Sequence, residues 1–368
     1  MQTARWTTER RLTRLLSGVA LVLASLAPGC MERGEEPIDA VGLASGTPLP
    51  RREGTVLVDG CSLDPWQDTT LALPSTRVVV SEVLFLCLVP RDDGTLGPAD
   101  AFARERLAFA VGEVKKRGYR ASLGVAFTDE TGTRYDGARI ARLVSSPSFR
   151  EGMIASLEEV AKGADAVDLD LQNAPTSSRA DVTTLVAAVS KKLRTSGKKL
   201  GVMLPPSVSD PSDLPGGEAF DRRALAPYVD RFRVMTLDYS ESGGPTIDTG
   251  WAVDAVRLAR TSGAPCFVSV PLYGVDFGPR GARGVSVLEA RGLASTYGAS
   301  PRRSATTTLT FSYVSQGEAH EVWFDDAEST GAMLGAFAGA LPPEVGVLYY
   351  GFGAEDPRLF ETIAERTR

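Results

Sequence analysis

The chain has 368 residues, of which 43% are hydrophobic and 23% charged, and its 46 acidic residues outnumber 40 basic ones for a net charge of −6. This ordinary globular composition excludes disordered, collagen-like and disulfide-scaffold proteins. Without a long basic stripe we expect no nucleic-acid partner, and a Ser-His-Asp triad or multi-histidine metal site would depend on the single histidine, His320. No P-loop, dinucleotide fingerprint or C-x-x-C spacing occurs, so we expect neither cofactor nor metal.

The first 30 residues have the composition of a targeting segment. Four arginines precede the apolar run from Val19 to Ala24, which is too short to span a membrane. Gly29-Cys30 resembles a bacterial lipobox, although Ala27 stands where Leu is usual. We expect an exported lipoprotein anchored to the cell envelope through a lipid on Cys30, with plain secretion as the alternative. Residues 31–54 are polar and punctuated by Gly and Pro, which is typical of a flexible tether.

Three further cysteines remain after Cys30. A disulfide between Cys61 and Cys87 is compatible with an oxidising compartment, but the sequence does not decide it. Cys87 and Cys266 lie in apolar, strand-like runs, where a buried free thiol is the simpler interpretation.

From about residue 54 onward, β-rich runs alternate with segments of helical periodicity. Most of these runs are continuously apolar, which is typical of parallel strands covered by helices. Eight strands are predicted, at Thr55–Asp59, Val83–Val89, Ser122–Phe127, Ala166–Leu171, Leu200–Leu204, Phe232–Leu237, Phe267–Pro271 and Val345–Tyr350.

The intervening segments carry helix signals. Ser146-Pro147 is typical of a capped helix start, Gly163, Gly197 and Gly263 mark helix ends, and Asp356-Pro357 is predicted to open a last helix. Alternating strands and helices predict a (β/α)8 barrel over residues 55–368, with an open doubly wound sheet as the alternative. The long connection at residues 275–344 contains a predicted hairpin, and we expect it to be a small α+β insertion.

The fourth predicted strand places two carboxyl groups on one face. Because side chains alternate along a strand, Asp168, Asp170 and Gln172 point together into the barrel. Buried carboxylates need partners and concentrate at functional sites, so this face is our candidate catalytic surface. The alternative is that these aspartates cap loops or pair with arginines.

This strand resembles the D-x-x-D-x-D-x-E signature of glycoside hydrolase family 18, the chitinase-like barrels. Four later segments resemble family motifs in the right order, and the last two look most like the branch of spore and peptidoglycan N-acetylglucosaminidases. These segments are Val234–Tyr239, Val270–Gly274, Val322–Ser329 and Gly346–Pro357. The resemblance implies a glycan partner containing N-acetylglucosamine, of the chitin or peptidoglycan type.

The departures from the family pattern concern its chemistry. In the family the substrate's acetamide attacks, a terminal Glu protonates the leaving oxygen, and a Tyr holds the acetamide. Here Gln172 stands at the acid position and Leu237 at the tyrosine position, while Tyr350 replaces a floor tryptophan. An amide has no titratable proton to give, and general acid catalysis contributes roughly 10²–10⁴-fold. At four other positions of the family pattern this sequence has the family's residues, namely Asp168, Asp170, Asp238 and Tyr273.

Three functions remain open. The first is a catalytically impaired barrel that binds such a glycan, as chitinase-like lectins do. The second is a glycosidase with a displaced acid, for which Glu241 and Glu130 are candidates. The third is a scaffold for a protein partner. Candidate sugar-stacking side chains, for which core packing is the alternative role, are Trp66, Tyr239, Tyr273, Tyr349 and Tyr350.

Overall fold

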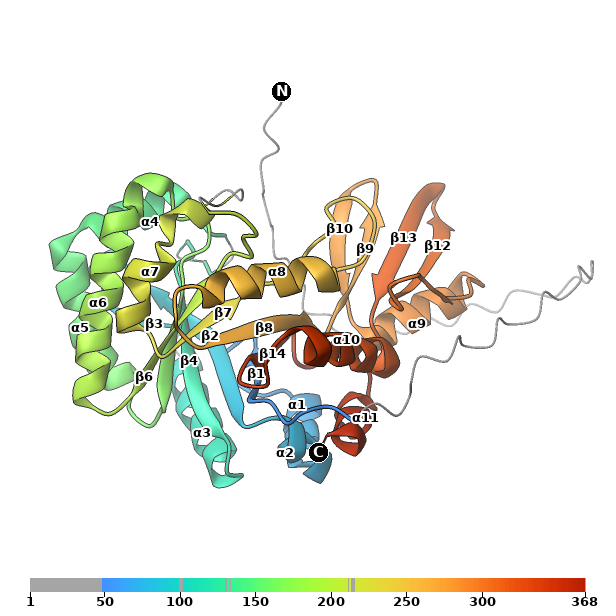
Figure 1. Cartoon of the computed structure of the whole chain (residues 1–368), viewed down its shortest axis with the longest axis horizontal. Helices are drawn as coiled ribbons and strands as arrows, with labels where there is room; N and C mark the ends of the chain where they lie inside the picture. The colour runs from blue at the N-terminus through green and yellow to red at the C-terminus, as the bar shows by residue number, and fades with distance from the viewer. Residues whose placement is uncertain are drawn as a thin grey trace, which may run out of the picture.

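The computed structural model describes residues 48–98, 102–129, 131–132, 134–210, 212 and 216–367, and within them the main sheet closes on itself. Its strands pair in the order β1-β14-β8-β7-β6-β5-β4-β2, and β1 also pairs with β2 (Figure 1). The predicted barrel is confirmed, and the open sheet is excluded. Its parallel strands are β1 (Gly54–Val58), β2 (Glu82–Pro90), β4 (Arg120–Ala126), β5 (Ala166–Asp170), β6 (Lys199–Leu204), β7 (Arg231–Val234), β8 (Cys266–Pro271) and β14 (Gly346–Tyr350).

Helices follow the strands and cover the outside of the barrel. Their starts obey local capping rules: the side chains of Ser146, Asp248 and Asp326 accept hydrogen bonds from backbone N–H groups in the first turns of α5, α8 and α10. The longer helices are α3 (Ala103–Lys116), α4 (Gly137–Ser145), α5 (Pro147–Val160), α6 (Arg179–Thr195), α8 (Thr249–Arg260) and α10 (Ala327–Ala340). The shorter ones are α1 (Pro65–Ala72), α2 (Pro74–Val79), α7 (Arg222–Leu225) and α11 (Leu359–Arg366), the last of which begins just beyond the predicted Asp356-Pro357.

Apolar side chains form two separate layers around the barrel sheet. Outward-facing strand residues such as Val167 and Leu169 pack in one large cluster with helix residues such as Leu157 and Val186. A second, smaller cluster fills the inside of the barrel. The continuous apolar runs of the sequence therefore correspond to strands that are buried on both faces.

The chain between β8 and α10 forms a five-stranded antiparallel sheet that stands beside the barrel, at the upper right of Figure 1. Helix α9 (Val287–Thr296) packs on one face of this sheet through Val287, Ala290 and Ala294. Helix α10, which follows the sheet, packs against α8 and α11 among the outer helices. In spatial order the strands are β10 (Gly281–Val285), β9 (Gly274–Gly278), β13 (Glu318–Phe324), β12 (Leu309–Ser315) and β11 (Arg302–Arg303).

Residues 48–54 pack against the barrel, inside the range that the sequence assigns to the tether. Leu49 is buried, and its backbone N–H donates to the carbonyl of Arg366 at 2.7 Å. The Arg52 guanidinium donates to four backbone carbonyls at and after the end of α10, those of Phe337, Leu341, Pro342 and Val345. The carbonyls of Phe337 and Pro342 also accept backbone N–H groups, so Arg52 ties the end of α10 and the turn after it to the start of the barrel. Cys30, the signal segment and the rest of the tether lie outside the described residues.

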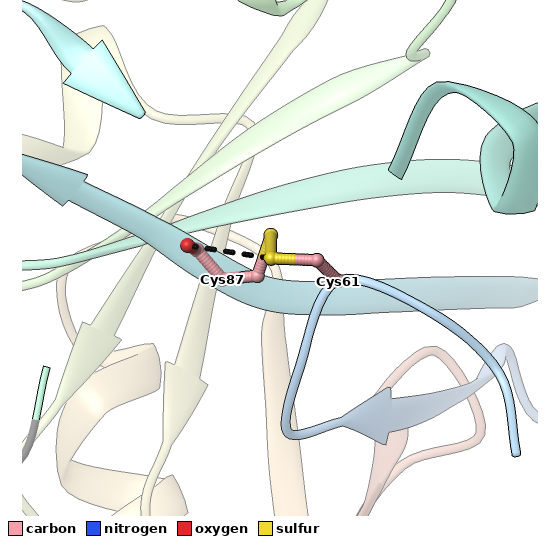
Figure 2. Close-up of a disulfide and its surroundings, with 2 residues drawn as sticks. All are labelled: Cys61 and Cys87. Atoms are coloured by element: carbon pink, nitrogen blue, oxygen red, sulfur yellow. Dashed lines mark hydrogen bonds between the residues drawn. A yellow bond between two sulfur atoms is a disulfide. The ribbon is translucent and has the colours of Figure 1, made fainter. Parts of the chain in front are cut away.

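A disulfide joins the loop after β1 to strand β2 (Figure 2). Its partners are Cys61 and Cys87, whose Cα atoms lie 5.2 Å apart, so the pairing that the sequence left open is formed. Cys266 is a buried free cysteine, and burial raises the pKa of its thiol to about 12. Among the helices of the described part of the chain, none is long and apolar enough to cross a membrane.

Candidate active site

Strand β5 places Asp168 and Asp170 inside the barrel, as predicted, but in different surroundings. Asp168 is fully buried in an ionic network with two arginines of β7. Its Oδ2 accepts from Arg231 at 2.7 Å, and its Oδ1 accepts from the Nε of Arg233, also at 2.7 Å. Glu82 of β2 completes the network by accepting from Arg231 at 2.8 Å and from Arg233 at 2.5 Å. Two carboxylates and two guanidinium groups thus neutralise one another.

The network holds Asp168 ionised. Burial alone would raise the pKa of Asp168, but the two guanidinium groups outweigh burial and lower that pKa to about 2. Strand β6 makes room for the carboxylate with Gly201, where a Cβ atom would lie 1.9 Å from Oδ1 of Asp168. With both of its oxygens bound to arginines, Asp168 acts as a counter-ion of the barrel interior.

An apolar layer separates this network from the carboxyl end of the barrel. Side chains two residues apart on a strand share a face. The next inward position after Glu82 is Leu84, and the next after Arg233 is Met235; both belong to the interior apolar cluster. Asp168 is therefore part of the support beneath the candidate site, and substrate-contacting groups lie one layer higher.

Asp170 occupies that higher layer, at the end of β5. Its Oδ2 accepts hydrogen bonds from the hydroxyl of Tyr135 and, at 3.2 Å, from Nε2 of Gln172. Gln172 is half-buried, and Tyr135 lies in the loop between β4 and α4. The position that carries the acid in the family pattern therefore holds a hydrogen-bond donor, which points to the carboxylate beside it.

A second carboxylate–tyrosine pair follows β7 and β8. The hydroxyl of Tyr273 donates to Oδ1 of Asp238 at 2.5 Å. Asp238 has a φ of 55°, a left-handed backbone conformation that is uncommon outside glycine and clusters at functional sites. The Tyr273 ring meets the ring of Tyr350 edge-on, with centroids 6.2 Å apart.

The two pairs flank one apolar floor. Leu237 and Tyr350 are both buried in the interior cluster, and the partly buried rings of Tyr135 and Tyr273 pack against it. The structure thus brings together five predicted residues, Asp170, Gln172, Leu237, Asp238 and Tyr273, with Tyr350 in the floor. This arrangement places hydrogen-bond acceptors and aromatic rings around an apolar patch at the carboxyl end of the barrel.

Among the predicted sugar-contacting aromatics, Tyr349 is buried in the outer apolar cluster, where its ring meets Phe360 edge-on, and two others also lie away from the floor. Trp66 of α1 is 38% exposed, and its Nε1 donates at 2.9 Å to Glu355, whose pKa is raised by burial. Tyr239 is 46% exposed and packs on Trp251 of α8, with ring centroids 5.2 Å apart. Neither ring belongs to the cluster that forms the floor.

Of the two candidate displaced acids, the structure describes only one. Glu241 lies on the loop after β7 and lines a groove of about 670 Å³ between that loop and the insertion sheet. Glu130 lies outside the described residues.

Within the described part of the chain, no cluster of three or more His, Cys, Asp or Glu side chains could hold a metal ion. Asp326, which follows β13, caps α10 by accepting from the backbone N–H of Ser329.

The sequence reasoning missed Tyr135, Glu82 and the two arginines of β7. Arg231 and Arg233 were detectable, because two charges at alternate positions of a strand-like run point to one buried face. Tyr135 comes from a loop, and no pattern in the sequence connects that loop with the end of β5.

No model of a known protein family matches the chain. Solved structures do. A chitinase from Chromobacterium violaceum superposes with a TM-score of 0.72 at 20% identity, covering 85% of this chain and 98% of that one. The chain has a chitinase-like fold. The spore cortex-lytic enzyme SleL of Bacillus megaterium superposes with a TM-score of 0.75 at 17% identity, covering 88% of this chain and 76% of that one.

One curated protein also resembles this chain in sequence. The Bacillus subtilis protein named "Putative sporulation-specific glycosylase YdhD" is 24% identical over 202 residues, which cover 51% of this chain. The match spans about half, 48%, of that relative's length. The predicted resemblance to glycoside hydrolase family 18 is thus confirmed at the level of the fold.

Proposed function

We propose that this chain is an exported barrel protein that binds a glycan containing N-acetylglucosamine, of the chitin or peptidoglycan type, without hydrolysing it. The observation that carries the proposal is the side chain at the acid position. Gln172 has no proton to transfer, and its Nε2 donates to Asp170 at 3.2 Å. A carboxylic acid would protonate a leaving oxygen there, whereas an amide only fixes Asp170 in place.

Leu237 removes a second catalytic element. In the family pattern a tyrosine at this position bonds the acetamide oxygen, and here the side chain is apolar and packed into the floor. The acetamide would lose one hydrogen bond during attack, but an apolar surface still accommodates its methyl group. Losing both elements disables the chemistry more than it disables binding.

Glycan binding is supported by what remains around the floor. Asp170, Asp238 and Tyr273 keep polar groups at its edge, and Tyr350 keeps an aromatic ring in it. The proteins of similar fold include a chitinase and a spore cortex-lytic enzyme, whose names imply polymers of amino sugars. A glycan of this kind is the ligand that best fits both observations.

Export and a membrane anchor complete the proposal. The Cys61–Cys87 disulfide suits an oxidising compartment, which supports an extracytoplasmic location. We assign the anchor to a lipid on Cys30, followed by the tether. Mass spectrometry of the mature chain tests the anchor: an acylated Cys30 at its amino end supports it, and a mature chain without acyl groups contradicts it.

The test of function uses the full chain, incubated overnight with chitotetraose and, separately, with solubilised peptidoglycan fragments. We expect saturable binding by calorimetry and intact saccharides by mass spectrometry. Cleavage that survives Gln172→Ala but not Glu241→Ala or Glu130→Ala would replace the proposal with a glycosidase whose acid is displaced. A folded chain that binds neither saccharide would leave the scaffold function.

A further inference from the structure

All seven lysines of the chain lie at one end of the barrel. They occupy the ends of α3, α5 and α6 and the connections from these helices to the next strands. In a (β/α)8 barrel such helix-to-strand connections lie at the amino end, opposite the candidate site. The arginines are not confined in this way, because they also occur in the insertion and in loops at the carboxyl end. The lysines are Lys115, Lys116, Lys162, Lys191, Lys192, Lys198 and Lys199.

Hydrogen bonds show that the three connections lie side by side. The Nζ of Lys115, at the end of α3, donates to the carbonyl of Gly163 at 2.9 Å, in the connection after α5. The Nζ of Lys198, in the connection after α6, donates to the neighbouring carbonyl of Ala164 at 2.6 Å. The lysines therefore share one continuous surface, formed by residues 113–120, 158–165 and 191–199, which we call the lysine face.

The lysine face is positive in a chain that is negative. Its three segments hold ten basic and four acidic residues, a net charge of +6, whereas the whole chain has a net charge of −6. The loops after β6 and β7 at the opposite end, residues 205–221 and 235–248, hold seven acidic residues and no basic one. An anionic surface would therefore attract the lysine face and repel the end that carries the candidate site.

Three lysines of this face are exposed to a partner. Lys162, Lys191 and Lys199 are exposed, and within the described part of the chain none of them forms an ion pair. The four acids of the face are each paired with another basic side chain, as Asp165 is with Lys115 at 2.9 Å. These acids therefore do not neutralise the three exposed lysines.

The described chain begins at this same end of the barrel. Leu49 bonds to the end of α11 and lines a small cavity together with Val78 of α2, the helix that leads into the start of β2. Residue 48 follows Cys30 by 18 positions, and a chain of that length spans at most about 60 Å. A lipid on Cys30 would thus keep the amino end of the barrel close to a membrane.

Two exposed apolar side chains lie beside the lysine face. Leu73 and Val78 form the α1–α2 corner, and both are exposed. This corner adjoins the end of α3, where Arg117 pairs with Asp68 of α1 at 2.7 Å. Apolar side chains next to basic ones are typical of surfaces that touch the headgroup region of a bilayer.

We propose that the amino end of the barrel docks on a membrane that contains anionic lipids, with the lysine face against the headgroup phosphates. The carboxyl end, with the candidate site, then faces away from the bilayer. The inference goes beyond the glycan site, and it rests on the part of the proposed function that anchors the chain through Cys30. The anchor brings the two surfaces together, and the lysine face sets the orientation of the barrel.

The test uses the full chain with Cys30→Ser, so that no lipid contributes, and measures sedimentation with vesicles of phosphatidylcholine alone or with phosphatidylglycerol added. We expect binding to the anionic vesicles only, and a loss of binding as salt is added. The triple variant Lys162→Gln, Lys191→Gln, Lys199→Gln should bind the anionic vesicles about 30-fold more weakly, because each basic group near an anionic surface strengthens binding.

A matched control removes the same charge elsewhere. The triple variant Arg134→Gln, Arg280→Gln, Arg302→Gln changes three exposed arginines in a carboxyl-end loop and in the insertion, and it should bind within about 2-fold of the native affinity. All of these chains share residues 1–47, so the difference between the two triple variants isolates the contribution of the lysine face.

The outcomes separate this inference from the proposed function. A lysine variant that binds as the native chain does, or a control variant that loses as much binding, overturns the docking surface. Tighter binding to soluble polyphosphate than to vesicles of the same total charge assigns the face to a soluble polyanion and overturns the membrane as its partner. Glycan binding and acylation of Cys30 are measured separately, by calorimetry and mass spectrometry, so their failure overturns the proposed function and is distinguished from a failure of this surface.

Discussion

Removing Arg233 from the barrel interior perturbs the structure at one of its fully buried charges. This side chain has no exposed surface and donates to Asp168 at 2.7 Å, to Glu82 at 2.5 Å and to Thr55 at 3.0 Å. Arg233→Met keeps an unbranched side chain of similar length but removes the charge. Asp168 and Glu82 then keep Arg231 between them. Among the described residues, the only other cation beside this pair is the partly exposed Arg120, which lies 3.4 Å from Glu82 and also pairs with Glu53, so the buried negative charge is under-compensated.

The expected cost follows from that under-compensated charge. Breaking a buried ion pair by removing one partner costs about 3–5 kcal/mol of unfolding free energy. In the native chain the pKa of Asp168 falls from 3.8 to about 2, so its ionisation stabilises the fold by roughly 2 kcal/mol above pH 4. That contribution is lost as the pH falls toward 2, because a lowered folded-state pKa favours the ionised form. In the variant a carboxylate can take up a proton instead, so the cost of the substitution shrinks in acid.

Urea unfolding followed by circular dichroism at pH 7 and pH 5 measures this. We expect a loss of about 4 kcal/mol at pH 7 and a clearly smaller loss at pH 5. The control Arg257→Met removes an exposed arginine of α8, which pairs with Asp254 at 3.5 Å, and should change stability by less than about 0.5 kcal/mol. The double variant Arg233→Met, Asp168→Leu restores charge balance and should recover part of the loss. A loss below about 1 kcal/mol at pH 7, or an equal loss at both pH values, would refute this reasoning.

Other parts of the fold give sharper local tests. Gly201→Ala places a Cβ atom 1.9 Å from Asp168 Oδ1 and should cost about 3 kcal/mol in urea unfolding, whereas a neutral result contradicts the tight packing there. Replacing Cys61 and Cys87 by Ser should cost about 3 kcal/mol, and a variant as stable as the native chain contradicts a formed disulfide. Burial raises the pKa of Asp325 to about 6, so its ionisation destabilises the fold as the pH rises through that value. Asp325→Asn should therefore stabilise the chain by roughly 2 kcal/mol at pH 8 and by nothing at pH 4, and a loss at pH 8 would show that the carboxylate is needed.

The sequence alone predicted those elements of the fold whose sequence signals are local. Helix α5 begins where Ser146-Pro147 predicts, because a cap and a proline act on the next turn alone. The eight strands could be predicted because a strand that is buried on both faces has a continuous run of apolar residues. The alternation of side chains along β5 also correctly predicted that Asp168 and Asp170 point into the barrel.

What the sequence did not specify is which distant groups meet. Asp168 pairs with arginines that lie 63 and 65 residues further along the chain, and nothing local distinguishes that partner from a substrate. The alternative that these aspartates pair with arginines thus holds for Asp168. Similarly, the anchoring of Arg52 to carbonyls after α10 depends on the closed barrel bringing both ends of the sheet together. Such contacts follow from the fold and cannot be deduced from residue spacing.

The most direct measurement is a gain of activity. The double variant Gln172→Glu, Leu237→Tyr restores the two groups whose loss is held responsible for the missing chemistry, and chitotetraose cleavage is followed by mass spectrometry. We expect no cleavage by the native chain and measurable cleavage by the double variant, since a general acid alone contributes roughly 10²–10⁴-fold. The single variant Gln172→Glu shows how much of the loss belongs to the acid. A double variant that binds chitotetraose as the native chain does, yet leaves it intact, would contradict this explanation of what was lost.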